Sequence, residues 1–336
     1  MKINDLLNHG INKVLKSNKK NILLGEDIKD PYGGAFRVTK DLSTKYPKQV
    51  FQMPISEPGF VGLATGMTFK GFNPIVEIMF GDFITLITDI LINTTSKFAQ
   101  LNNKRMSGKI LIRTPSGGKR GYGPIHSQTL EKIFFGWPEI NVYALNRLLC
   151  PKKTFEEIFS EETKVKLLIE NKIDYGKNLY EDIEIKKKGF NFKKVSNKIP
   201  LSILKNHEDN KNPDILFCCY GGVVSEVIDA AYTLMIEKEI SSSIFIPIKI
   251  SPIDSCLIEE IKKNYFKKMI IIEDGYTSCG WGSHLLTNLS ENKFNIKLSE
   301  VEIYGPKNYM IPANFYKEKE FFPNSKSIYD NIINSL

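Results

Sequence analysis

The 336-residue sequence has few cysteines and no long apolar run. Its five cysteines include no CxxC pair, so we expect reduced thiols and neither a disulfide framework nor a zinc site. Apolar stretches such as Phe83–Ile92 are interrupted by Asp89 and are shorter than the ~18–20 residues that a membrane span requires. The first residues carry Asp5 and lack the apolar region of a secretory signal. We therefore expect a cytoplasmic protein without a membrane span.

Arginine is also scarce, although the chain is basic. The formal net charge is +8, but only five of the 46 Lys+Arg residues are arginine. Recognition of phosphates and bases favours the rigid arginine fork, and the lysines here are spread over the whole chain. This pattern argues against a nucleic-acid-binding protein. Four of the five arginines (105, 113, 120 and 147) nevertheless fall in one region, where a ligand site or a structural ion pair would each explain them.

The remaining composition predicts two globular domains. With 42% hydrophobic residues, 21 Phe and 14 Tyr, the chain can bury enough apolar surface to form a core, and its length suits two domains. Short strand-like runs alternate with helical spacing, for instance over Glu57–Lys70 and Asp82–Leu101, which predicts an α/β fold of two α/β/α domains with mainly parallel sheets. The expected organisation is a first domain over 1–180, a Lys- and Asn-rich linker or surface excursion over 181–212, and a second domain over 213–336.

Three segments follow predicted strands, where open α/β sheets bind their ligands. They are Gly25–Asp27, Ser56–Gly59 and the glycine-rich stretch Arg113–Gln128, which presents His126 at its end. Core packing does not explain the third segment. It is either a functional loop or a mobile surface loop with an incidental histidine.

Glu57 also has two interpretations. It follows a strand, with Ser56 as a candidate N-cap and Pro58 in the first turn, so it could simply be an acid favoured by the helix dipole. The helix that follows, GFVGLATGMTF, is apolar on most faces and is therefore expected to be buried. A carboxyl group at the start of such a helix would have a raised pKa and could share a proton near neutral pH.

Several motifs in one order resemble a known family. LLGEDI, PISEPGFVGLATGMTF, EIMFGDF, IRTPSGG and GPIHSQTLEK, then IIIEDGYTSCGWGSHL, are similar to the beta subunit of thiamine-diphosphate-dependent 2-oxo acid dehydrogenases of the pyruvate, branched-chain and acetoin type. The resemblance covers nearly the whole chain and marks a divergent subgroup. It implies a pyrimidine-binding domain followed by a transketolase C-terminal-like domain, in an enzyme that decarboxylates a 2-oxo acid and passes the product to lipoamide or another acceptor.

The resemblance also implies roles for individual residues. Glu57 is expected to hydrogen-bond a nitrogen of the cofactor's aminopyrimidine ring and so to promote its activation. His126 is expected to act on the substrate or an intermediate as a proton donor or electrostatic stabiliser. The other expected cofactor-binding residues are Met79, Phe80, Phe83, of which Phe83 would stack on the pyrimidine, and Glu26.

One family feature is missing from this chain. Thiamine-diphosphate enzymes bind Mg²⁺ and the diphosphate through a GDG…NN motif, whereas this chain has GDF at Gly81–Phe83 and EDG at Glu273–Gly275. No metal ligand is therefore assigned here. The resemblance implies an alpha subunit that carries GDG…NN and holds Mg²⁺, with the active site at the interface of an α2β2 heterotetramer that is active only when assembled. A lipoyl acyltransferase (E2) is a further partner if lipoamide is the acceptor.

Other departures leave the reaction open. After HSQ this chain reads VYALNRLLCPKKTFEEIF where family members resemble V-x-P-S-T-P-x-D-A, so the monovalent-cation site of some members is not carried over. Two alternatives remain: the C-terminal half of a split transketolase in a biosynthetic pathway, and a catalytically silent assembly subunit. The sequence names neither the 2-oxo acid nor the acceptor, and it leaves the roles of Arg113 and Arg120 open.

Overall fold

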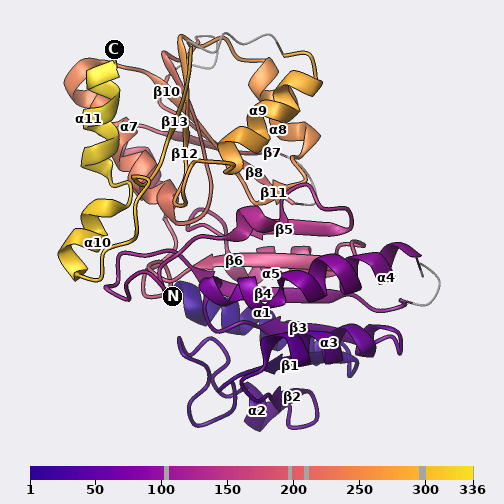
Figure 1. Ribbon diagram of the computed structural model, residues 1–336. Helices are drawn as coiled ribbons and strands as arrows, with labels where there is room; N and C mark the ends of the chain where they lie inside the picture. The colour runs from indigo at the N-terminus through magenta and orange to yellow at the C-terminus, as the bar shows by residue number, and fades with distance from the viewer. Residues whose placement is uncertain (102–105, 196–198, 208–211, 295–299, 336) are drawn as a thin grey trace.

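The computed structural model describes residues 1–101, 106–195, 199–207, 212–294 and 300–335. They form two α/β units, one after the other along the chain, each a sheet with helices on its faces (Figure 1). No helix within those ranges is long and apolar enough to cross a membrane. The predicted α/β class with two mainly parallel sheets is confirmed.

The first sheet has seven strands in the order β11-β5-β6-β4-β3-β1-β2. Strands β1 to β6 run parallel, and β11 from the second half of the chain pairs antiparallel with β5 at one edge. The strands are β1 (Asn21–Gly25), β2 (Val50–Gln52), β3 (Asn73–Glu77), β4 (Ile110–Ser116), β5 (Ile140–Ala144), β6 (Val165–Asn171) and β11 (Lys249–Ser251).

Alternating side chains bury both faces of this sheet. Leu23 of β1 packs into the apolar cluster beneath α1 and α5, while its neighbours Ile22 and Leu24 belong to the cluster on the side of α3. Because a strand buried on both faces needs apolar side chains on each face, Ile22–Leu24 of this strand form a continuous apolar run. The helices of this unit are α1 (Ile3–Ser17), α2 (Leu42–Lys45), α3 (Glu57–Thr68), α4 (Ser96–Leu101) and α5 (Pro151–Ser160).

The stretch Asp82–Leu101, for which the spacing predicted helical structure, is helical for most of its length but is not one continuous α-helix. This segment contains a 3₁₀ turn over Gly81–Ile87, a π-helical stretch over Ile90–Thr95 and then α4. The Thr95 hydroxyl hydrogen-bonds the Ile90 carbonyl at 2.9 Å and lies 2.8 Å from the Thr65 hydroxyl of α3. These side-chain contacts accompany the wider helical turn, which a 3.6-residue periodicity does not reveal.

The second sheet has six strands in the order β13-β12-β9-β10-β8-β7, parallel over the first four and antiparallel at β8 and β7. Its strands are β7 (Asn191–Val195), β8 (Leu201–Lys205), β9 (Ile215–Cys219), β10 (Ser242–Pro247), β12 (Lys268–Ile272) and β13 (Val301–Tyr304). Its helices are α6 (Asp182–Lys187), α7 (Val224–Lys238), α8 (Ser255–Lys262), α9 (Trp281–Glu291), α10 (Phe315–Phe321) and α11 (Ser325–Ser335). A short 3₁₀ turn at Gly221–Val223 precedes α7, and another at Glu131–Phe134 precedes β5 of the first sheet.

Residues 181–212, expected to be a linker, contribute α6, β7 and β8. The edge strand β7 reads NFKKV and is largely exposed. Its two adjacent lysines face solvent, so the sequence lacks the alternation of apolar and polar residues by which a strand is recognised. Residues 196–198 and 208–211 lie outside the described part of the chain. The boundaries 1–180 and 213–336 remain a proposal.

The two units share one core. A single apolar cluster contains Ile112 of the first sheet and Leu216 of the second, together with Trp281 at the start of α9. The loop after β4 runs against α10, near the point where the two units meet (Figure 1). The site residues described below are thus supported from both halves of the chain.

Candidate active site

Glu57 is the first residue of α3, directly after the turn that follows β2. Its side chain is only 6% exposed. Ser56 occupies the N-cap position without a side-chain cap, and no described residue donates a hydrogen bond to the Glu57 carboxylate. A nearly buried carboxyl group without a protein partner is costly unless a ligand supplies one.

Glu26 lies beside it, at the end of β1. Because β1 and β2 are parallel neighbours, their carboxyl ends bring Glu26 and the start of α3 to the same edge of the sheet. Burial, reinforced by the charges of Glu57 and Asp27, raises the pKa of the Glu26 carboxyl to about 7, although a hydrogen bond from the Ser56 backbone opposes the shift. Its Oε1 atom is buried without any hydrogen-bond partner among the described residues.

Three rings gather next to each other where EIMFGDF and HSQ meet. The His126 imidazole lies edge-on to Phe80, with ring centroids 4.7 Å apart, and to Phe83, at 5.4 Å. Phe80 and Phe83 are themselves 5.8 Å apart. Met79 is half-buried and belongs to none of the apolar clusters of the described residues, so the structure does not join it to these rings. No described side chain hydrogen-bonds the His126 ring, whose nitrogens stay available to a ligand.

Each residue of the HSQ motif has its own anchor or contact. Ser127 donates its hydroxyl to Glu318 of α10 at 3.1 Å. Gln128 donates both its backbone N–H and its side-chain amide to Asp82 Oδ1, at 3.1 and 3.0 Å. Lys172, at the end of β6, donates its ammonium to the His126 carbonyl at 2.8 Å, and burial lowers the pKa of that ammonium to about 8. Residues from three distant segments thus fix the backbone around His126.

The glycine-rich loop packs against α10 and its end and does not project freely into solvent. The Glu318 carboxylate is fully buried and also accepts hydrogen bonds from the backbone N–H groups of Arg120, at 3.1 Å, and Gly123, at 3.0 Å. A Cβ on Gly118 would lie 2.0 Å from the Phe322 ring, and Gly121 has φ +78° directly against Phe315. The glycines are therefore needed for close contact with α10 and its end.

Arg113 and Arg120, whose roles the sequence left undecided, have different environments. Arg113 of β4 is buried between Glu77 of β3 and Glu170 of β6, and it pairs with both carboxylates. Tyr175 donates its hydroxyl to the same Glu170. Arg113 is thus a structural ion pair across three strands, one of the two explanations that the sequence left open. Arg120 is exposed and lies 5.4 Å from the rings of both Phe36 and Tyr122. Arg105 lies outside the described residues.

Helix α3 is not buried on all sides, as its apolar sequence had led us to expect. Phe60, Val61 and Ala64 pack into the core, but Leu63 is 51% exposed and Ile55, just before the helix, is 87% exposed. The glycines at positions 59 and 66 are exposed on this helix too. Apolar residues on an open helix face next to a site typically mark a partner interface.

The residues present fit one half of a thiamine-type cofactor. Two carboxyl groups, one of them with an orphaned buried oxygen, stand at the strand ends, and the three rings supply apolar surface with the free imidazole nitrogens. An aminopyrimidine ring offers both hydrogen-bond donors and acceptors to such a set. In contrast, no group of three or more His, Cys, Asp or Glu among the described residues could hold a metal ion.

Sequence reasoning missed Asp82, Lys172 and Glu318. Asp82 stands inside EIMFGDF, so the motif itself could have indicated it. Lys172 lies 46 residues from His126, and Glu318 lies 191 residues from Ser127. Nothing in the local sequence of either residue indicates these contacts.

Comparison with known proteins agrees with this geometry. The model of the transketolase pyrimidine-binding domain matches residues 1–147, and that of the transketolase C-terminal domain matches residues 205–328. The mitochondrial pyruvate dehydrogenase E1 component subunit beta of Pisum sativum is 26% identical over 331 residues, which are 98% of this chain and 88% of the relative. The corresponding subunit of Rickettsia felis is 24% identical over 332 residues, 98% of this chain and 96% of the relative.

A solved structure extends the likeness to the fold. A split gene transketolase, described as an inactive beta4 tetramer, superposes with a TM-score of 0.72 at 16% identity and covers 99% of this chain and 97% of its own. The chain thus belongs to the transketolase-like superfamily as a divergent relative of the pyruvate dehydrogenase E1 beta subunits, with a pyrimidine-binding domain followed by a transketolase C-terminal domain.

Proposed function

We propose that this protein is the beta subunit of a two-component, thiamine-diphosphate-dependent 2-oxo acid dehydrogenase or decarboxylase. The observation that carries the proposal is the pair of nearly buried carboxyl groups, Glu57 and Glu26, at neighbouring strand ends with one orphaned oxygen. The similarity to pyruvate dehydrogenase E1 beta subunits over 98% of the chain supports it. The 2-oxo acid and the acceptor, lipoamide or another, stay open.

In this proposal the chain supplies the acid–base groups. Bound thiamine diphosphate provides the electron sink for breaking the carbon–carbon bond of a 2-oxo acid. Glu57 would hydrogen-bond a nitrogen of the aminopyrimidine ring, and its poor access to water would strengthen that contact. The pKa of Glu26 is about 7, so this carboxyl group can donate or accept a proton next to Glu57 near neutral pH. Phe83 and Phe80 exclude water, and His126 presents its free nitrogens to the substrate.

The proposal includes an alpha subunit as partner, in an α2β2 assembly. The described residues of this chain offer no metal-binding cluster, and its sequence has no GDG…NN motif, so Mg²⁺ and the diphosphate are assigned to the partner. The open apolar face beside Glu57, formed by Ile55 and Leu63, is the surface where that partner would complete the site. A lipoyl acyltransferase is a further partner only if lipoamide is the acceptor.

The test is reconstitution with the partner. The chain, co-purified with an alpha subunit that carries GDG…NN, is expected to release CO2 from a 2-oxo acid only when both chains, thiamine diphosphate and Mg²⁺ are present. Glu57→Gln in the complex should lower kcat by about a hundredfold or more, because a proton-transfer group contributes on that order. Asp5→Asn, an exposed carboxylate of α1, is the matched control and should leave kcat unchanged.

Two results would contradict the proposal. Wild-type turnover in the Glu57→Gln complex would remove Glu57 from the mechanism. Turnover of sugar phosphates in place of every 2-oxo acid tested would favour the split transketolase, and no turnover of either class in a stable complex that binds the cofactor would favour an assembly subunit.

A further inference from the structure

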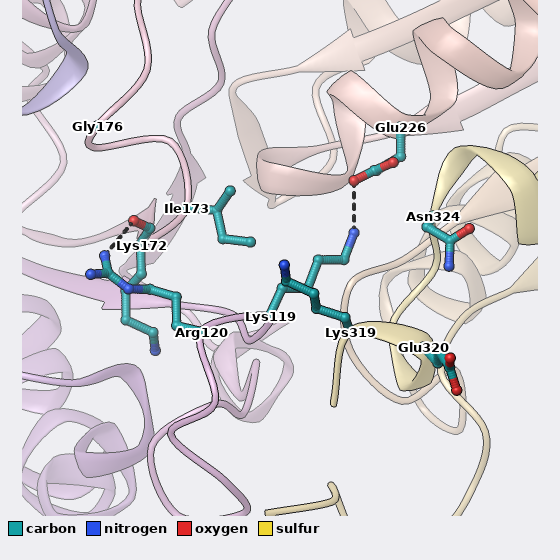
Figure 2. Close-up of a pocket in the computed structure, with 9 residues that line it drawn as sticks. All are labelled: Lys119, Arg120, Lys172, Ile173, Gly176, Glu226, Lys319, Glu320 and Asn324. Carbon is teal, nitrogen blue, oxygen red and sulfur yellow. Dashed lines mark hydrogen bonds and ion pairs between the residues drawn. The ribbon is translucent and has the colours of Figure 1, made fainter. Parts of the chain in front are cut away.

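A cavity of about 580 Å³ lies between the two units, beside the candidate active site, because the ammonium of its lining residue Lys172 is 5.4 Å from the Phe80 ring. Its walls come from the loop after β4, the turn after β6, the first turn of α7 and the end of α10, as Figure 2 shows. None of the residues assigned to the cofactor or the substrate lines it. The lining residues are Lys119, Arg120, Lys172, Ile173, Gly176, Glu226, Lys319, Glu320 and Asn324.

One acidic residue of the cavity is already paired. Glu226 accepts a hydrogen bond from the Lys119 ammonium at 2.9 Å and another from the Ser325 backbone at 2.9 Å. Lys119 also donates to the Pro323 carbonyl at 2.6 Å, which leaves one of its three N–H groups unused. The ion pair therefore holds Lys119 in place and cancels the Glu226 charge.

The charges of Arg120 and Lys319 are not cancelled. Arg120 donates through Nη1 to the Lys172 carbonyl at 3.1 Å, so most of its donors are unused, and no ion pair forms with it among the described residues. Lys319 lies 4.2 Å over the Phe315 ring, and within the described ranges it makes no hydrogen bond or ion pair. Figure 2 shows its ammonium pointing into the cavity, while the Glu320 carboxylate points away.

We propose that this cavity is a binding site for a small phosphate monoester. Two uncompensated positive charges match the charge of about −2 on such a group near neutral pH. The fork of Arg120 suits phosphate oxygens, and Lys319 and the spare Lys119 donor supply point charges beside it. The volume lies within the range of about 300–1,000 Å³ that small-molecule sites occupy, so an organic moiety fits beside the phosphate, against Ile173.

The site is built into the support of the His126 loop. Arg120 and Lys119 belong to that loop, and the Arg120 backbone is held by Glu318, next to Lys319. Lys172, whose carbonyl orients Arg120, holds the His126 carbonyl with its ammonium. A phosphate ester that bridges Arg120 and Lys319 would therefore tie the loop and α10 together.

The experiment is calorimetric titration of the full-length chain with glycerol 3-phosphate at low ionic strength. Arg120→Gln and Lys319→Gln are each expected to weaken binding by about tenfold, because each removes a charge-assisted contact. Lys317→Gln changes an exposed lysine of the same helix that does not line the cavity, and it should bind like the wild type. Glu57→Gln should also bind like the wild type, so this result does not depend on the proposed function.

Parallel titrations identify the ligand class. Inorganic phosphate should bind through the same two residues but more weakly than the ester, since it lacks the organic moiety. Succinate that bound as tightly as the ester would overturn the assignment to phosphate. No measurable binding of the ester, or an equal loss in Lys317→Gln, would overturn the site itself.

Discussion

At the scale of single residues, the informative feature is a shortage of partners around buried carboxyl groups. Arg113 and its two glutamates show the opposite case, because each charge in that cluster is paired. Glu57 and Glu26 are almost as buried but lack such partners. A core acid would be expected to have them, so the contrast separates a ligand site from a structural ion pair.

Glu26 predicts a pH dependence of stability. Its pKa is about 7 in the folded chain against an ordinary value of 4.5, so between these pH values the folded state binds more protons than the unfolded state. Stability from this group is therefore lost as the pH rises through 7. Relative to the wild type, Glu26→Gln should gain on the order of 1–3 kcal/mol in unfolding free energy between pH 5 and pH 8.

The measurement is urea unfolding of the wild type and of Glu26→Gln at several pH values between 5 and 8. The difference between variant and wild type isolates Glu26, because other buried acids such as Glu131 titrate in both proteins. An identical pH slope in the two chains would show that Glu26 is ionised throughout this range.

The sequence predicted the residues that carry motifs and missed those that act from a distance. Glu57 and His126 were indicated by PISE and HSQ, and the structure brings His126 together with Phe80 and Phe83. Their roles in catalysis stay predictions. Lys172 supports the same loop through a backbone carbonyl, a contact that has no sequence signature because any donor of suitable length could make it.

At the scale of elements, the glycine-rich loop and α10 form one unit. Glu318 accepts three hydrogen bonds from the loop and is fully buried, while Glu320 on the same helix is exposed. Four glycines between residues 117 and 123 indicate a loop of unusual conformation, but only the structure shows that Phe322 and Phe315 occupy the space that side chains would take.

Glu318 is a positioning residue for His126. In the reconstituted complex, Glu318→Gln should lower kcat by about tenfold with a smaller change in cofactor affinity, because an amide replaces a carboxylate that accepts three bonds. Hydrogen exchange of residues 117–128 should become faster at the same time. Glu320→Gln is the matched control and should change neither quantity.

A different outcome would show that Glu318 has only a structural role. If Glu318→Gln lowered only the global stability and left both kcat in the remaining folded protein and loop exchange unchanged, Glu318 would be a structural acid without a link to the site.

At the scale of the whole molecule, fold class was easier to predict than element membership. The alternation of strand-like and helical segments predicted the parallel sheets, and strands such as β1, with Ile22–Leu24 apolar on both covered faces, agree with it. Edge strands behave differently. The lysines of β7 interrupt the apolar–polar alternation expected of a strand, and β11 has only three residues, too few for any periodicity. The sequence therefore did not predict β7, nor the return of the chain to the first sheet at β11.

The open face of α3 predicts a test of assembly. Leu63→Asp should abolish co-elution with the alpha subunit in size-exclusion chromatography, because it places a charge in the proposed interface. Ile236 is 62% exposed and belongs to α7, which lies far from α3 in Figure 1, so Ile236→Asp should co-elute normally. Both variants should fold with wild-type circular dichroism, and a stable complex containing Leu63→Asp would place the partner on another surface.

Strand β11 has a consequence for how this polypeptide could be divided. It belongs by sequence to the second half yet completes the border of the first layer, next to β5. A chain cut near residue 180 would leave β5 at an unpaired edge of the leading fragment, and the His126 loop would lose its Glu318 anchor while keeping its contacts to Asp82 and Lys172. The two halves are therefore expected to depend on each other for a complete first sheet and a fully supported loop.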